Sequence, residues 1–159
     1  MFTVQASISD LVTIRTDIES VRIFLRDFDN FRELMPGIEE IHLDRSGHSH
    51  WKIRTEIPVV GHLTERFALQ FNEDDGYMEW SPVAGTIGNF LRFSATLEKR
   101  DADTDVRFAL AVEMRRDAGK NLHVLAPIAG EHRISREMER RVGEMIRTFI
   151  TRIKQRLER

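Results

Sequence analysis

Apolar and polar residues alternate along the first fourteen positions of the chain. From Phe2 to Ile14 every even position is apolar except Asp10. Side chains of a β-strand point alternately to the two faces of a sheet, so this period of two predicts a strand with one buried face. The sequence therefore begins with a long strand.

Two short helices are predicted directly after this strand. Thr16 is followed three residues later by Glu19, and Asn30 by Glu33, and both pairs have the spacing of a capping box. The sequence Pro36-Gly37 then ends the second helix, since proline cannot continue a helix and glycine tolerates left-handed dihedrals.

From residue 38 to about 115 the pattern returns to a period of two, in segments separated by turn sequences such as "RSG", "EDDG" and "RDADT". Short connections favour antiparallel neighbours, because parallel strands need a crossover of about a dozen residues. The predicted strands of this meander are 38–44, 49–57, 63–72, 77–81, 89–99 and 105–115.

The last segment, residues 131–158, carries apolar residues at steps of three and four with charged residues between them. This spacing predicts a long amphipathic helix. An antiparallel sheet of seven strands with its helices on one face is an α+β fold, and the whole chain, 1–159, is expected to form one domain.

This order of elements resembles the helix-grip superfamily of START, birch-pollen-allergen and polyketide cyclase/dehydrase domains, also called SRPBCC. The phrase "DFDNFRELMPGIEEI" is similar to the segment after the first helix of bacterial cyclase/dehydrase-like members, and "SHWKI" and "MEWSPVAG" resemble two of their strands. The resemblance implies a seven-stranded curved sheet around the long C-terminal helix, with a hydrophobic cavity between them. It implies a hydrophobic or lipid-like ligand, and no catalytic motif is shared across the superfamily.

Alternation places one side chain in two on the inner face of the sheet, independently of the resemblance. The inner face is rich in aromatic and aliphatic residues, which suits either an apolar pocket or a solid core, and the alternation does not decide between them. The candidate ligand-binding residues are Trp51, Ile53, Thr55, Glu65, Phe67, Leu69, Trp80, Asn89, Leu91, Phe93, Phe108 and Leu110 from the sheet, with Met138, Val142, Met145 and Phe149 from the long helix.

Glu65 is the candidate with the most chemistry, because a carboxylate interrupts an otherwise apolar inner phase. Desolvation there would favour its protonated form and suit it to acid or base catalysis, or it would hold the polar end of a ligand. The structural alternative is a residue at the sheet rim that pairs with an arginine, such as Arg92 or Arg54, or with water. Asn89 has the same two interpretations, a strand-end cap or a ligand anchor.

Three histidines, His42, His48 and His50, fall within nine positions. A hairpin with Gly47 in its loop would place His42 opposite His50, close enough for imidazoles to converge on a metal. All three lie on the outer, hydrated phase of the hairpin, so we expect no metal site there. The segment 116–132 is expected to be either a lid over the cavity mouth or a short extra helix at the end of the sheet.

Composition narrows the remaining possibilities. The chain has no cysteine, no apolar run near the roughly 20 residues that span a bilayer, and no secretory signal, so a cytoplasmic protein without disulfides is expected. Residues 115–159 carry 12 Lys and Arg against 6 Asp and Glu, yet no basic stripe with interleaved aromatic residues favours nucleic acid. No cofactor motif is present, and the oligomeric state, monomer or homodimer, stays open.

Three functions are compatible with these observations. The first is binding or transport of a small hydrophobic molecule between the sheet and the C-terminal helix. The second is a cyclase- or dehydrase-type enzyme that uses the same cavity, with Glu65 as the candidate acid or base. The third is a partner-binding or assembly subunit that uses the hairpin edge and the basic face of the long helix, with Arg140, Arg141 and Arg147.

Overall fold

A computed structural model describes residues 1–158 and has the predicted α+β architecture. The strands of these residues are β1 (Phe2–Ile14), β2 (Ile38–Leu43), β3 (Ser49–Ile57), β4 (Gly61–Asp74), β5 (Tyr77–Pro82), β6 (Asn89–Arg100) and β7 (Asp103–Arg116). The helices are α1 (Ile18–Arg26), α2 (Phe28–Leu34), α3 (Ala126–Ala129) and α4 (Glu131–Leu157), with a 3-10 turn at Gly119–Asn121.

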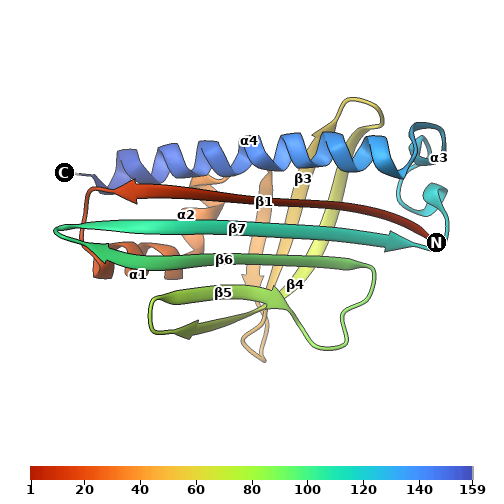
Figure 1. Ribbon diagram of the computed structural model, residues 1–159. Coiled ribbons are helices and arrows are strands. Elements are labelled where there is room, and N and C mark those ends of the chain that lie inside the picture. The colour runs from red at the N-terminus through yellow and green to blue at the C-terminus, as the bar shows by residue number, and fades with distance from the viewer. Residues whose placement is uncertain (159) are drawn as a thin grey trace.

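Within residues 1–158 the strands form one seven-stranded antiparallel sheet in the order β1-β7-β6-β5-β4-β3-β2. The sheet curls strongly: β1 and β7 run alongside α4, while β3 and β4 turn across behind it (Figure 1). The helix α4 packs on β1 and β3, which lie towards opposite ends of the strand order, so the curved sheet wraps around it. The predicted seven-stranded sheet around a long C-terminal helix is confirmed.

The two short helices are confirmed, but their predicted caps are wrong by one to three residues. Asp17, not Thr16, caps α1, since its carboxylate accepts a hydrogen bond from the amide of Ser20 at 3.1 Å. Asp27, not Asn30, caps α2. Asn30 lies inside that helix instead, and its side-chain amide donates to the carbonyl of Phe24 at 2.8 Å. In both cases an aspartate close to the predicted cap takes the position, because its carboxylate is as good an acceptor for free helix amides.

The hairpin between β2 and β3 has the predicted register. His42 is paired with His50, and Gly47 has a φ of 84° in the connecting loop. The segment 116–132 contains the 3-10 turn and α3, as in the second of its two predicted forms. Ala126 is buried there, whereas Val124 and Ile128 are exposed.

Between the sheet and α4, the core is filled by aromatic rings at the end nearest α1 and α2. The ring of Phe31, from α2, lies 5.2 to 5.3 Å from the rings of Trp51, Trp80 and Phe149, measured between centroids, and 5.9 Å from that of Phe93. Such separations are typical of favourable edge and offset-stacked contacts. Phe31 therefore closes one half of the space under α4.

Candidate functional site

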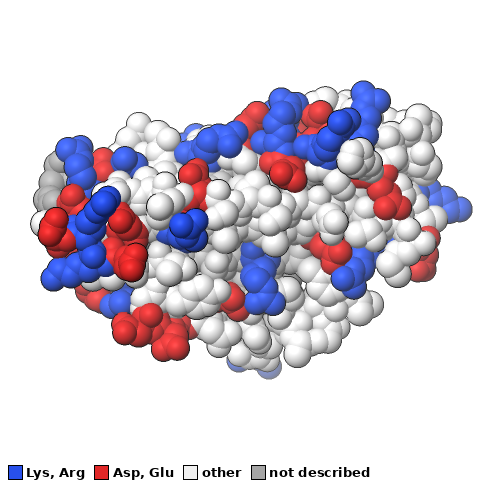
Figure 2. Space-filling model, in the orientation of Figure 1, with Lys and Arg blue, Asp and Glu red and all other residues white. Residues whose placement is uncertain are grey.

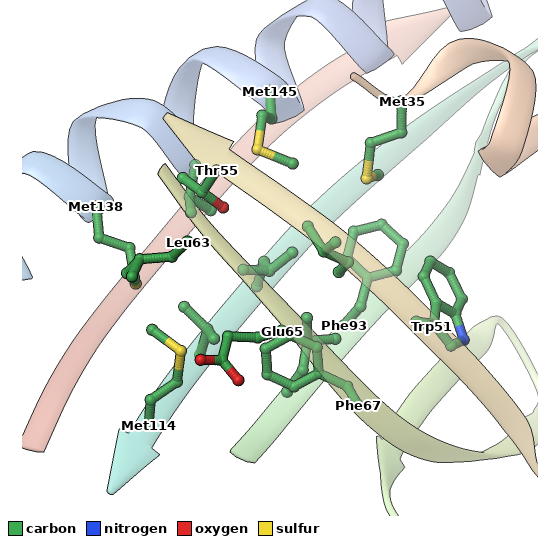
Figure 3. A pocket seen from close by; sticks show the side chains of 15 residues that line it. Met35, Trp51, Thr55, Leu63, Glu65, Phe67, Phe93, Met114, Met138 and Met145 are labelled. Carbon is green, nitrogen blue, oxygen red and sulfur yellow. The ribbon is translucent and has the colours of Figure 1, made fainter. Parts of the chain in front are cut away.

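A cavity lies beside this aromatic cluster, between the amino-terminal half of α4 and the inner face of the sheet. Its volume is about 50 Å³. Its walls come from β3, β4, β6, β7, α4 and the residue that follows α2, as Figure 3 shows. The lining residues are Met35, Trp51, Ile53, Thr55, Leu63, Glu65, Phe67, Leu91, Phe93, Leu110, Val112, Met114, Met138, Val142 and Met145.

Most of the candidate residues chosen from the sequence border this cavity, but several do not. Trp80, Phe108 and Phe149 belong to the aromatic cluster around or next to Phe31. Leu69 is fully buried next to the start of β3, where it pairs in register with Ser49. Asn89 lies behind Glu65. These residues share the inward phase of the lining residues, so phase alone does not distinguish the residues that line the cavity from those that do not.

Four lining residues were not among the candidates. Leu63, Val112 and Met114 have the inward phase, so alternation alone was sufficient to find them. Met35 caps the carboxyl end of α2 and lies outside any periodic segment. No strand or helix period marks such a position, and only the tertiary structure brings it over the sheet.

The cavity in this conformation is smaller than known small-molecule sites, which have volumes of roughly 300 to 1,000 Å³. Four of its lining residues are methionines, which reach it from α4, β7 and the segment after α2: Met35, Met114, Met138 and Met145. Methionine has three rotatable side-chain bonds and fills irregular gaps readily, so these walls are the most adaptable part of the core. The interior is therefore neither a large cavity nor a solid core. It is nearly filled, and flexible methionine side chains form part of the wall of the small cavity that remains.

Glu65 lines the cavity and is held by two partners. Its Oε2 accepts a hydrogen bond from the side-chain amide of Asn89 at 2.9 Å and one from the guanidinium of Arg116 at 2.9 Å. The side chains of Glu65 and Arg116 are only 19% and 18% exposed. Glu65 thus pairs with an arginine at this edge of the sheet, as the structural alternative predicts, but the arginine is Arg116 and not Arg92 or Arg54, the two given as examples.

The two arginines named in that alternative are engaged elsewhere. Arg92 forms an ion pair with Glu79, and Arg54 with Glu56. The partner instead comes from the end of β7, because β4 continues past the end of β5 at this point. The pairing of β4 with β5 starts only at Leu69, so the ends of β6 and β7 reach Glu65 directly.

A groove on the surface adjoins the cavity. It has a volume of about 450 Å³ and lies between α4, the start of β2 and the end of β3. Thr55 and Met145 line both the groove and the cavity. The rim of the groove carries charges of both signs, among them Arg54, Arg141 and Glu144. Met145 and Thr55 therefore form the partition between the interior and the surface.

The three histidines of the hairpin form a different arrangement. The rings of His42 and His50 stack at 5.1 Å between centroids, and His50 Nε2 is 2.8 Å from Asp44 Oδ2. This hydrogen bond is the main cause that holds the pKa of Asp44 below its ordinary value. Across residues 1–158, no group of three or more His, Asp or Glu side chains is placed to hold a metal ion.

Two of the three arginines named for the partner-binding alternative, Arg140 and Arg141, are paired with glutamates of α4 itself. Arg140 pairs with Glu137 and with Glu144, and Arg141 also pairs with Glu144. On the face shown in Figure 2, basic and acidic groups alternate along the edge where α4 lies. These contacts weaken the case for α4 as a uniformly basic docking surface. Among the described helices, none is long and apolar enough to cross a membrane.

Comparison with known proteins gives the fold. No protein-family model matches the chain. The di-domain ARO/CYC BexL superposes with a TM-score of 0.66 at 13% identity, over 98% of this chain and 51% of that one. The ZhuI aromatase/cyclase from a Streptomyces species has a TM-score of 0.63 at 12% identity, over 96% of this chain and 95% of that one. The chain has the helix-grip fold.

Two further similarities complete this comparison. A START superfamily protein from Mycobacterium smegmatis has a TM-score of 0.59 at 12% identity and is matched over 96% of its length, with 95% of this chain covered. Ankyrin repeat and SOCS box protein 3 from Bos taurus is 23% identical over 91 residues, which make up 52% of this chain and 17% of that protein. The similarity to helix-grip structures extends along nearly the whole chain, whereas this last one is local.

Proposed function

We propose that this protein binds a small hydrophobic molecule in the cavity between the curved sheet and α4. The observation that carries the proposal is the lining itself: apart from Thr55 and Glu65, every lining residue is apolar. An apolar pocket with a few polar groups that orient the ligand is the usual composition of a small-molecule site. A START superfamily protein and two aromatase/cyclases share this architecture.

Binding requires the cavity to widen, since about 50 Å³ is too small for a ring or an alkyl chain. The methionines supply the movement. Met138 and Met145 on α4 and Met35 after α2 all border the cavity (Figure 3), and rotation of these flexible side chains would enlarge it without displacing a strand. A ligand that enters from the groove meets Met145 first, because this side chain lines both spaces.

The methionines also provide the test, as four of the six in the chain line the cavity and two do not. The protein is labelled with ¹³C at the methionine methyl groups and titrated with octan-1-ol. We expect the methyl signals of Met35, Met114, Met138 and Met145 to shift with saturation. The signals of Met1, which is exposed, and Met78, which is buried elsewhere, are the internal controls. A titration without saturable shifts, or with shifts at Met1 alone, would contradict the proposal.

An enzyme of cyclase or dehydrase type would use the same cavity, with Glu65 as its acid or base. One observation counts against it. Glu65 is the only ionisable residue among those lining the cavity, so the site offers no second group for an acid and base pair. Loss of turnover of a polyketide-like substrate in Glu65→Gln, with ligand binding retained, would favour the enzyme over the binding protein.

A further inference from the structure

The polar part of the cavity is concentrated at one point of its wall. Glu65 projects into the cavity between Phe67 and Met114, and the other polar lining residue, Thr55, lies towards the groove (Figure 3). A ligand that fills the apolar space beneath α4 thus meets the carboxylate of Glu65 at the end remote from Met145. The chemistry of this contact selects the ligand's head group.

The carboxylate is available to a ligand through one of its oxygens. Both hydrogen bonds described for Glu65 reach Oε2, from Asn89 and from Arg116. An ionised carboxylate has two acceptor oxygens with about four lone-pair positions in total and donates nothing. Oε1 therefore offers an acceptor, and a group that only accepts hydrogen bonds finds no donor in this carboxylate.

The charge of Glu65 is already matched. The guanidinium of Arg116 is 2.9 Å away and as little exposed as the carboxylate, and Arg116 is absent from the cavity lining. The arginine thus compensates the charge from behind while the acceptor faces the ligand. A second cation in the cavity would lose its hydration without an unmatched anion to receive it. An anion would meet the carboxylate directly.

We propose that the ligand carries a neutral hydroxyl group at one end of an apolar body and donates this hydroxyl to Glu65. The inference rests on the proposed binding function and specifies its ligand class. An alcohol or a phenol satisfies the acceptor without adding charge to a site whose charges already balance. Fatty acids, phosphate esters and amines of the same size are disfavoured.

Three probes with one octyl chain and different head groups test the inference: octan-1-ol, octanoate and octylamine at neutral pH. Dissociation constants come from the methionine methyl shifts. We expect octan-1-ol to bind about tenfold more tightly than octanoate, because one charge-assisted hydrogen bond contributes about a factor of ten to affinity. The affinity of octylamine should lie between the two. Equal affinities, or tightest binding of octanoate or octylamine, would overturn the inference and leave the binding function intact. Absence of binding by all three would overturn both.

Glu65→Gln should bring the affinities of octan-1-ol and octanoate within about threefold of each other, because the amide both donates and accepts. The control is Glu113→Gln, which removes a glutamate paired with Arg115 that does not line the cavity and should keep the tenfold ratio. An unchanged ratio in Glu65→Gln would contradict the inference.

A second variant acts on the charge balance and leaves Glu65 in place. Arg116→Met removes the compensating cation from behind the carboxylate, so octylamine should become the tightest of the three probes. A purely structural role of the ion pair would weaken all three probes alike. Retention of octan-1-ol as the tightest probe in Arg116→Met would show that the compensated charge does not select the head group.

Discussion

The two halves of the space under α4 differ although they share one helix and one sheet. Towards the carboxyl end of the helix, Phe149 stacks on Phe31, and the rings of Trp80 and Phe93 complete a close-packed cluster. Towards the amino end, Met138, Val142 and Met145 face a cavity. The helix α2 inserts Phe31 into one half only, and this insertion makes the difference.

The comparison shows how one sheet and one helix enclose both a rigid region and an adaptable one. Aromatic rings have few rotatable bonds and fill the first half rigidly, whereas methionines leave the second half adaptable. Trp51 and Phe93 belong to both halves, since each ring contacts Phe31 and also lines the cavity. Substitutions in the two halves should therefore have opposite consequences for stability and ligand affinity.

The largest effect is expected from removal of the ring that fills the first half. Phe31 is fully buried, and Phe31→Ala should lower the free energy of unfolding by about 3–5 kcal/mol, as large-to-small changes at buried aromatic residues do. The matched variant in the second half is Met145→Ala, which should lower it by less than half as much because Met145 is half-buried and borders space already empty. Urea unfolding measures both, and equal losses would remove the contrast between the halves.

The next largest loss of stability is expected from substitution of a glycine that lies beside the partition formed by Met145 and Thr55. Gly37 has a φ of 89°, and a Cβ atom there would lie 2.6 Å from the carbonyl oxygen of Arg54 and 3.1 Å from the terminal methyl of Met145. Gly37→Ala should therefore lower the free energy of unfolding by about 2–3 kcal/mol, through left-handed strain and a backbone clash together.

The hairpin glycine Gly47 is the control for this variant. Its φ is 84° and a Cβ atom would meet nothing within 4 Å, so Gly47→Ala measures the strain alone, about 1 kcal/mol. Equal losses in the two variants would show that the approach of Gly37 to β3 and Met145 carries no cost.

The same added methylene group should have different effects in the two halves. Val106 is fully buried near the start of β7, where its register partners are Val12 and Leu97. Val106→Leu should cost about 1–3 kcal/mol through overpacking. Val142 lines the cavity, so the larger side chain in Val142→Leu has space to occupy, and the free energy of unfolding should stay within about 1 kcal/mol of that of the original protein. The same side chain takes up space that a ligand would fill, so binding of octan-1-ol should weaken several-fold. Thermal unfolding and the methyl titration measure the two effects, and a large loss of stability in Val142→Leu would mean that the cavity is not an adaptable space.

The smallest expected effect is on the pH dependence of stability, at the carboxyl end of α4 beside the filled half. Glu158, which follows α4, accepts a hydrogen bond from the backbone amide of Arg15 at 3.0 Å, and this bond is the main cause that lowers the pKa of Glu158 from its ordinary value of 4.5. A lowered folded-state pKa contributes stability above the unfolded value, and that contribution is lost as the pH falls through the folded value. Glu158→Gln should thus be slightly less stable than the original protein at pH 7, with the difference shrinking by pH 3.5. A difference independent of pH in urea unfolding would exclude this link.

Much of the architecture is predictable from the sequence because it depends on local periods. The alternation in residues 2–14 and 38–115 gives the strands, the steps of three and four in residues 131–158 give the helix, and the register of His42 with His50 follows from a three-residue loop with one glycine. Even the inward position of Glu65 follows from its phase. The helix caps were less predictable, because neighbouring Asp17 and Thr16 both offer an oxygen to the same free amides.

The tertiary structure alone decided which inward side chains border open space and what Glu65 contacts. Trp80 and Trp51 share the inward phase and both rings contact Phe31 of α2, yet Trp51 also lines the cavity and Trp80 does not. Glu65 meets Arg116 across 51 positions because β5 ends early and the sheet curls. Periodicity determines which face a side chain takes, since that depends on neighbouring dihedral angles. Whether the face is filled depends on contacts between distant segments, which no local pattern contains.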